Sequence, residues 1–66
     1  MTVKVNGQAR ELSEGTSIAS LLEQMKLKPQ HVAVELNRRL VRAEKYEVPL
    51  SDGDQVELVT FVGGGG

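Results

Sequence analysis

Helical periodicity occurs in a single segment of this sequence, and this limits the fold more than any other feature. Starting from Ile18, apolar residues recur at spacings of three, four and seven, on one side of a helix: Ile18, Leu21, Leu22 and Met25. Thr16 or Ser17 can cap the start of this helix, and Pro29 is expected to end it. Lys26 and Lys28 suit its negative C-terminal end. One helix can cover only one face of a sheet.

The residues before the helix predict a β-hairpin. Residues 2–6 alternate between polar and apolar side chains, with Val3 and Val5 on the same face. Asn6-Gly7 follows, a dipeptide typical of two-residue hairpin turns because both residues tolerate positive φ. Residues 8–12 are then the returning strand.

The residues after the helix predict three further strands. These are expected at 31–36, 39–42 and 55–62, with a turn at 37–38, irregular structure with room for one helical turn at 43–50, and a turn at 51–54. In the first of them Val32, Val34 and Leu36 point inward. The last strand is expected in the middle of the sheet, beside the first one, with Val56 and Leu58 toward the helix. Val59 and Phe61 then face away from the helix, where they are either exposed for a partner or shielded by residues 43–50.

Together these elements predict an α+β roll with a mixed sheet of four to five strands and one helix across one face. The folded domain is expected to span residues 1–62, and residues 63–66 to form a flexible glycine tail. Ordering four glycines would cost roughly 4–8 kcal/mol with no side-chain burial to offset it. The tail is therefore either a disordered end or a segment whose functional group is the terminal carboxylate.

Composition excludes several classes of site and partner. The 66 residues include no cysteine, so there is no disulfide, no cysteine metal site and no side chain that can carry a persulfide. His31 is the sole histidine, which leaves a histidine-based metal site or catalytic triad without a second member. The net charge of −1, with both signs interspersed, argues against nucleic-acid and anionic-membrane binding. No apolar run has the length of a signal peptide or membrane span, so a cytoplasmic location is expected.

Several short motifs together resemble the ubiquitin-like β-grasp proteins and, among them, the ThiS/MoaD family of sulfur carriers. The motifs are VNG at 5–7, LLEQ at 21–24, VAVELN at 32–37, DGDQVELV at 52–59 and the terminal glycines. The resemblance covers the whole chain. It departs from the family where Val41-Arg42-Ala43 and Tyr46 stand in place of a Val-Pro-Arg and a Trp.

The resemblance implies a carrier that is a co-substrate and not an enzyme, with no catalytic residue and no permanently bound cofactor. Gly66 would be the covalent site, adenylated and then converted to a thiocarboxylate, with Gly65 beside it and Gly63 and Gly64 in the tail. The implied partners are a ThiF-like adenylyltransferase of the ubiquitin-activating type that uses ATP, a sulfur donor such as a cysteine desulfurase, and a ThiG-like thiazole synthase of thiamin biosynthesis. Partner contacts are expected at Phe61, Val59 and Val62.

Other functions remain open from the sequence. The carrier could serve molybdopterin, cysteine or siderophore synthesis, or the chain could be a ubiquitin-like modifier or a non-covalent β-grasp binding module. The basic residues Arg38, Arg39, Arg42 and Lys45 are expected to form a solvated turn, with docking on an acidic partner as the alternative.

Overall fold

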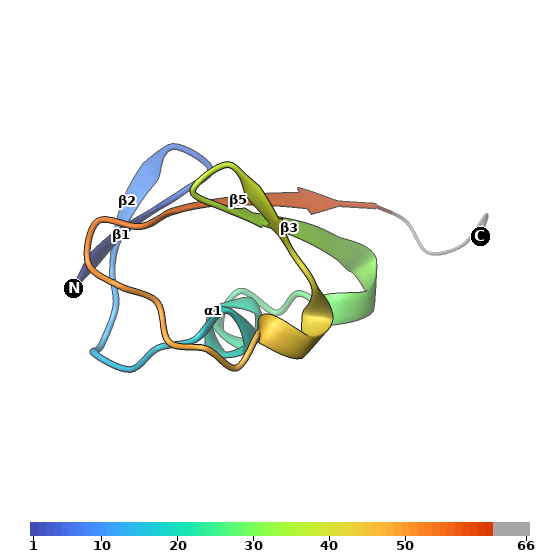
Figure 1. Ribbon diagram of the computed structural model, residues 1–66, viewed down its shortest axis with the longest axis horizontal. Coiled ribbons are helices and arrows are strands. Elements are labelled where there is room, and N and C mark those ends of the chain that lie inside the picture. Colours follow the sequence, from blue (N-terminus) through green and yellow to red (C-terminus); the bar gives the residue numbers. More distant parts are fainter. Residues whose placement is uncertain (62–66) are drawn as a thin grey trace.

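A computed structural model describes residues 1–61, which form a five-stranded sheet with one α-helix across one face (Figure 1). The elements in chain order are β1 (Thr2–Val5), β2 (Gln8–Glu11), α1 (Ile18–Gln24), the 3-10 turn η1 (Pro29–His31), β3 (Val32–Leu36), β4 (Arg39–Val41), the 3-10 turn η2 (Ala43–Lys45) and β5 (Gln55–Thr60). The predicted α+β roll is confirmed. No helix among the described residues is long and apolar enough to cross a membrane.

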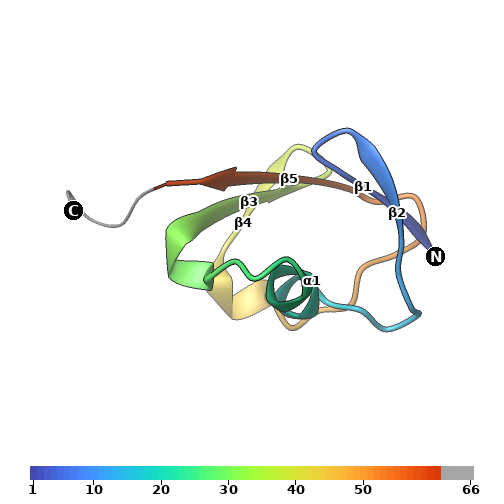
Figure 2. The same cartoon turned by 180° about the vertical axis from the view of Figure 1, so that it is seen from behind.

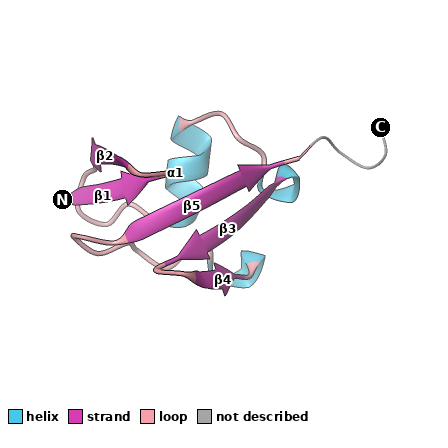
Figure 3. Ribbon diagram, turned by 90° about the horizontal axis from the view of Figure 1, so that it is seen from above, coloured by secondary structure: helices cyan, strands magenta, loops and turns pink. Residues whose placement is uncertain are grey.

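The order of the strands across the sheet is β2-β1-β5-β3-β4, so β5 is central (Figure 3). It runs parallel to β1, with Val5 beside Val56, and antiparallel to β3, with Val34 beside Leu58. The two remaining pairings, β1 with β2 and β3 with β4, are antiparallel hairpins. The predicted position of the last strand beside the first is therefore confirmed.

An asparagine in each hairpin turn ties that hairpin to β5. Asn6 and Asn37 both have positive φ, 51° and 52°, as two-residue hairpin turns require. The Oδ1 of Asn6 accepts a hydrogen bond from the backbone N–H of Leu58 (2.7 Å), and the Oδ1 of Asn37 accepts one from the N–H of Gln55 (2.9 Å). Side chains of both turns therefore add hydrogen bonds to the backbone of β5, besides those that β5 makes with β1 and β3.

Helix α1 begins at a serine cap and ends earlier than the sequence predicts. The Oγ of Ser17 accepts a hydrogen bond from the N–H of Ser20 (3.1 Å), which makes Ser17 the N-cap. At the other end, Lys26 has φ 60°, its N–H bonds Glu23 O, and the N–H of Leu27 bonds Leu22 O. This is the Schellman pattern. The helix therefore ends at Gln24, because the backbone of Lys26 adopts the left-handed conformation. The expectation that Pro29 ends the helix is wrong. No basic residue lies in the last turn of the helix.

The strand ends also differ from the predicted bounds by one or two residues. His31 belongs to η1, so β3 starts at Val32, and β4 ends at Val41 before η2. The last strand ends at Thr60, whereas a strand through residue 62 was expected.

The core lies between the sheet and α1. Its buried apolar residues are Val3, Val5, Leu12, Ile18, Leu21, Leu22, Val32, Val34, Tyr46, Leu50, Val56 and Leu58. Met25 and Leu36, both predicted to point inward, are half-buried against this cluster. Tyr46 and Leu50 come from the irregular segment 43–50, which contains η2 and runs on the α1 side of the sheet (Figures 1 and 2).

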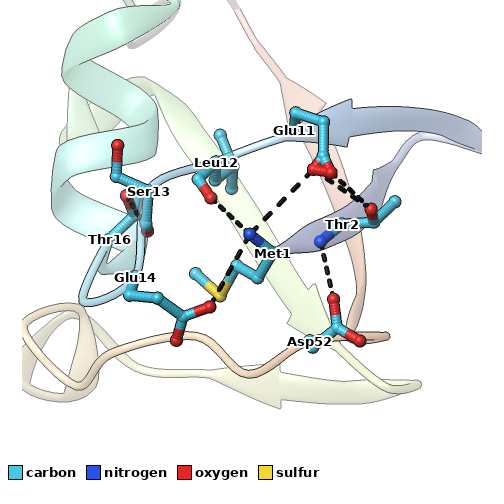
Figure 4. A network of polar contacts seen from close by, with 8 residues as sticks. All are labelled: Met1, Thr2, Glu11, Leu12, Ser13, Glu14, Thr16 and Asp52. Carbon is cyan, nitrogen blue, oxygen red and sulfur yellow. Dashed lines mark hydrogen bonds and ion pairs between the residues drawn. The ribbon is translucent and has the colours of Figure 1, made fainter.

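Polar contacts join β1, β2 and the turn before β5 at the edge of the sheet where the chain starts (Figure 4). The amino group of Met1 donates to Leu12 O (2.7 Å), the N–H of Thr2 donates to the carboxylate of Asp52 (2.7 Å), and the hydroxyl of Thr2 donates to Glu11 (2.8 Å). These contacts lie at the opposite end of the molecule from the C-terminal end of β5 (Figure 1).

Candidate functional site

The candidate site is the C-terminal end of β5, where the strand is paired with β3. Along β5, Val56 and Leu58 are buried toward α1, whereas Glu57 and Val59 point away from it. Val59 is 61% exposed and Phe61 is 51% exposed. The N–H of Phe61 donates to His31 O (3.0 Å), which fixes the backbone one residue beyond the end of the strand. The predicted assignment of the two faces of β5 is therefore confirmed.

Segment 43–50 does not shield this pair, so of the two alternatives the exposed one holds. The N–H of Ala19 donates to Tyr46 O (2.9 Å), and the N–H of Leu50 donates to Thr16 O (2.8 Å). Ser17 and Pro49 also form an isolated β-bridge. The segment is thus hydrogen-bonded along α1, on the other side of the sheet from Val59.

An acidic pair lies next to the exposed apolar residues. In the register of β3 and β5, Ala33 is opposite Val59 and Glu35 is opposite Glu57, and both glutamates are exposed. Like charges in directly opposite positions of two strands destabilise a sheet. The open face therefore presents an apolar end beside the chain's exit and two carboxylates further along the same strands. Such a face can dock a partner surface that combines apolar and basic side chains.

The described side chains offer no metal centre. No group of three His, Cys, Asp or Glu residues within residues 1–61 is placed to hold a metal ion. His31 is exposed in η1, and the four basic residues of the predicted solvated turn, Arg38, Arg39, Arg42 and Lys45, are exposed as well.

Other parts of the predicted site lie outside the described residues: Val62, Gly63, Gly64, Gly65 and Gly66. Their assignment as partner contact, tail and covalent site stays a prediction. So does the division of the chain into a domain of residues 1–62 and a tail of 63–66.

Two exposed apolar residues were missed at the sequence level, Leu40 and Val48. Leu40 lies in the middle of β4, an edge strand, and Val48 follows η2. The sequence did contain a signal for Leu40: in a strand, successive side chains point to opposite faces, so Leu40 and the half-buried Val41 cannot both point to the core. Val48 had no such signal, since segment 43–50 has no period.

The chain is similar along nearly its whole length to known proteins. The family model described as "ThiS family" matches residues 3–65. The sulfur carrier protein ThiS of Bacillus subtilis is 38% identical, over 96% of this chain and 98% of that protein. The crystal structure of the thiamine biosynthesis protein ThiS from Geobacter metallireducens superposes with a TM-score of 0.81 at 32% identity, covering 97% of this chain and 99% of the other.

Longer proteins also contain a segment that is similar to this chain. The thiazole synthase of Paramagnetospirillum magneticum is 36% identical over 98% of this chain. The chain spans about a fifth of the length of the two thiazole synthases that it matches. The resemblance noted from the sequence motifs is confirmed by the family model, by the relatives of matching length and by the superposed fold: the chain belongs to the ThiS family.

Proposed function

We propose that this chain is a cytoplasmic sulfur carrier for thiazole formation in thiamin biosynthesis, and that its reactive group is the terminal carboxylate of Gly66. The chain acts as a co-substrate of other enzymes, with no catalytic residue and no permanently bound cofactor of its own. An adenylyltransferase of the ubiquitin-activating type consumes the ATP, a cysteine desulfurase supplies sulfur, and a thiazole synthase receives it.

The proposed chemistry has three steps on the chain itself. A carboxylate oxygen of Gly66 attacks the α-phosphorus of ATP, so that an acyl adenylate forms and pyrophosphate leaves. The persulfide of the donor then attacks the acyl carbon and displaces AMP, which leaves an acyl disulfide. A thiol reductant cleaves the sulfur–sulfur bond of that disulfide, so that the chain keeps a thiocarboxylate and the donor cysteine is released. Glycines suit a substrate that must enter a narrow channel, because they have no Cβ and adopt backbone angles closed to other residues.

The observation that carries the proposal is the match of the ThiS family model through residue 65, which includes the glycines next to the proposed reactive end. The fold adds support. The central strand β5 ends at Thr60, two positions before residue 62 in the sequence, and Val59 and Phe61 near this end are exposed apolar residues. The similarity to part of a thiazole synthase favours that enzyme class as the sulfur acceptor.

Intact mass spectrometry tests the proposal. The chain is incubated with ATP, a cysteine desulfurase with cysteine, a thiol reductant and a ThiF-like adenylyltransferase. We expect a mass gain equal to the exchange of one oxygen for sulfur. A matched variant with a leucine added after Gly66 should show no gain, because the bulky residue closes the channel to the carboxylate. Its thermal unfolding should match that of the unmodified chain.

Three results would contradict the proposal. Sulfur gain by the leucine-extended variant would mean that the sulfur is carried elsewhere. Higher-mass conjugates on lysines of other proteins, without the thiocarboxylate, would identify a ubiquitin-like modifier. Binding of partners that is unaffected by deletion of the terminal glycines, again without sulfur gain, would identify a non-covalent binding module.

A further inference from the structure

A groove at the β4 edge of the sheet is separate from the candidate site at the end of β5. It has a volume of about 450 Å³, and its lining includes Leu36, Leu40, Val41, Arg42, Val48 and Pro49. It lies between β4 and the segment that follows it, on the side of the sheet covered by α1, since Ile18 also lines it. Val48 is 56% exposed, so apolar surface in the groove remains open to solvent. Leu40 is 69% exposed and lies opposite Glu35, so its side chain extends the apolar surface of this edge onto the open face of the sheet. The proposed function uses none of these residues.

The backbone of β4 is available for pairing beside this groove. β4 is the last strand of the sheet and pairs only with β3. The turn between them has two residues, so the flanking residues Leu36 and Arg39 form the hydrogen-bonded pair. The next pair, Glu35 and Leu40, is then a non-hydrogen-bonded pair, which directs the N–H and C=O of Leu40 toward the free edge. An extended peptide could add there as a further strand.

Segment 38–45, which forms this edge and one side of the groove, carries a net positive charge. Half of the chain's eight Lys and Arg residues lie between positions 38 and 45, a segment with a single carboxylate, Glu44, although the whole chain has a net charge of −1. The four cations, Arg38, Arg39, Arg42 and Lys45, are all exposed. Within residues 1–61, the structure records no ion pair for any of them. Their charge is therefore available to a partner.

We propose that the β4 edge and its groove bind an extended, acidic segment of a partner protein. The segment pairs with the backbone of Leu40, places apolar side chains in the groove, and brings carboxylates to Arg39, Arg42 and Lys45. A second copy of this chain is a poor occupant, because pairing two β4 edges would bring the same arginines together. Cations on an edge strand are a known protection against such self-pairing. Complementary charge on a partner instead speeds association and selects the partner.

Selection from a random peptide library tests which peptides bind the groove, without a choice of peptide sequence in advance. A phage-displayed library of short random peptides is selected against the immobilised chain, and an enriched peptide is synthesised and titrated into the ¹⁵N-labelled chain. We expect enriched peptides in which apolar residues alternate or cluster beside Asp and Glu. The largest amide shifts should fall at Leu40, Val41 and Val48, and the Leu40 amide should become protected from hydrogen exchange.

Charge variants test the proposed electrostatic contact. Arg39→Glu combined with Arg42→Glu should weaken binding of the enriched peptide by about tenfold or more, since opposite charges become like charges at a close contact. Arg10→Glu is the matched control: Arg10 is exposed on β2, at the other edge of the sheet, and its reversal should change affinity less than about twofold. Thermal unfolding of each variant checks that it is folded.

Several outcomes would overturn the proposal: no enrichment over an unrelated immobilised protein, enriched peptides that are basic or uncharged, or shifts that map to β2 or to Val59 and Phe61 at the end of β5. A concentration-dependent dimer in sedimentation, with the Leu40 amide protected by self-association, would identify a second copy as the occupant. None of these measurements involves sulfur loading, so their failure leaves the proposed carrier function untouched, and failure of sulfur loading leaves the groove proposal standing.

Discussion

At the scale of single residues, Asn6 and Asn37 take equivalent positions in two hairpins that are far apart in the sequence. Each adopts a positive φ, and each directs its amide oxygen to a backbone N–H of β5. Asparagine is suited to this position because it tolerates the left-handed region and carries an acceptor on a short side chain. A glycine would satisfy the first requirement and not the second.

Substitution of Asn6 separates these two requirements. Asn6→Ala should lower the free energy of unfolding by about 2–4 kcal/mol, because the Leu58 N–H loses its acceptor and the alanine is strained at φ 51°. Asn6→Gly should lower it less, since only the hydrogen bond is lost. Asn6→Asp keeps the acceptor and is the control. Urea unfolding measures all three, and an Ala variant as stable as the Asp variant would show that the hydrogen bond contributes nothing.

At the scale of elements, β5 has different roles on its two faces. Its inward residues complete the core under α1, and its outward residues are open to solvent next to the exit of the chain. The backbone of β5 is fixed by β3 along the strand and by β1 at its first two residues, so it does not depend on contacts made by the outward face. The outward side chains can therefore serve binding without disturbing the fold.

Neighbouring truncations on β5 test this division. Leu58→Ala should lower the free energy of unfolding by about 2–5 kcal/mol, because Leu58 is 7% exposed and its loss leaves a cavity in the core. Val59→Ala, the adjacent control, should change it by less than about 0.5 kcal/mol, as exposed positions usually do. Urea unfolding of both variants measures the difference. Equal losses would mean that both faces of β5 contribute to the core.

At the scale of the whole molecule, the contacts that start the chain and those that end the described part lie at opposite ends (Figure 1). The turn before β5 is held by Thr2 and Asp52, and the end of β5 is held by His31. In the proposed function the folded body supplies the binding energy, because four glycines offer little surface to a partner. The apolar side chains nearest the exit are then the expected anchors.

Phe61 provides the test at this scale. Phe61→Ala should raise the KM for the adenylyltransferase by about tenfold or more, since truncation of an aromatic anchor often costs about 2 kcal/mol or more. Unfolding temperature should change little, because the ring is half exposed. Thr60→Ala, the adjacent position on the other face of β5, is the control and should leave KM unchanged. A KM unaffected by Phe61→Ala would place the docking surface elsewhere; a large drop in unfolding temperature would place the ring in the core.

The sequence by itself determined the elements and most of the core. One helical stripe and period-two runs specify one helix and several strands, and alternation along residues 55–60 correctly separates Leu58 from Val59, because the side-chain period of a strand is fixed by its backbone geometry. Asn6-Gly7 likewise specified the first turn through positive φ alone. These are local properties, and local chemistry is enough to predict them.

The tertiary structure decided what depends on residues distant in sequence. The end of α1 at Gln24 could not be predicted, because lysine carries no signal for the left-handed conformation that Lys26 adopts. That conformation is held by the hydrogen bond from the N–H of Lys26 to Glu23 O, by the one from the N–H of Leu27 to Leu22 O, and by the packing of the Leu27 side chain. The path of segment 43–50 along α1 decided that Val59 and Phe61 are open to solvent and that a groove forms beside Leu40. Which face an aperiodic segment covers is set by the surface against which it packs, and that surface exists only once the chain has folded.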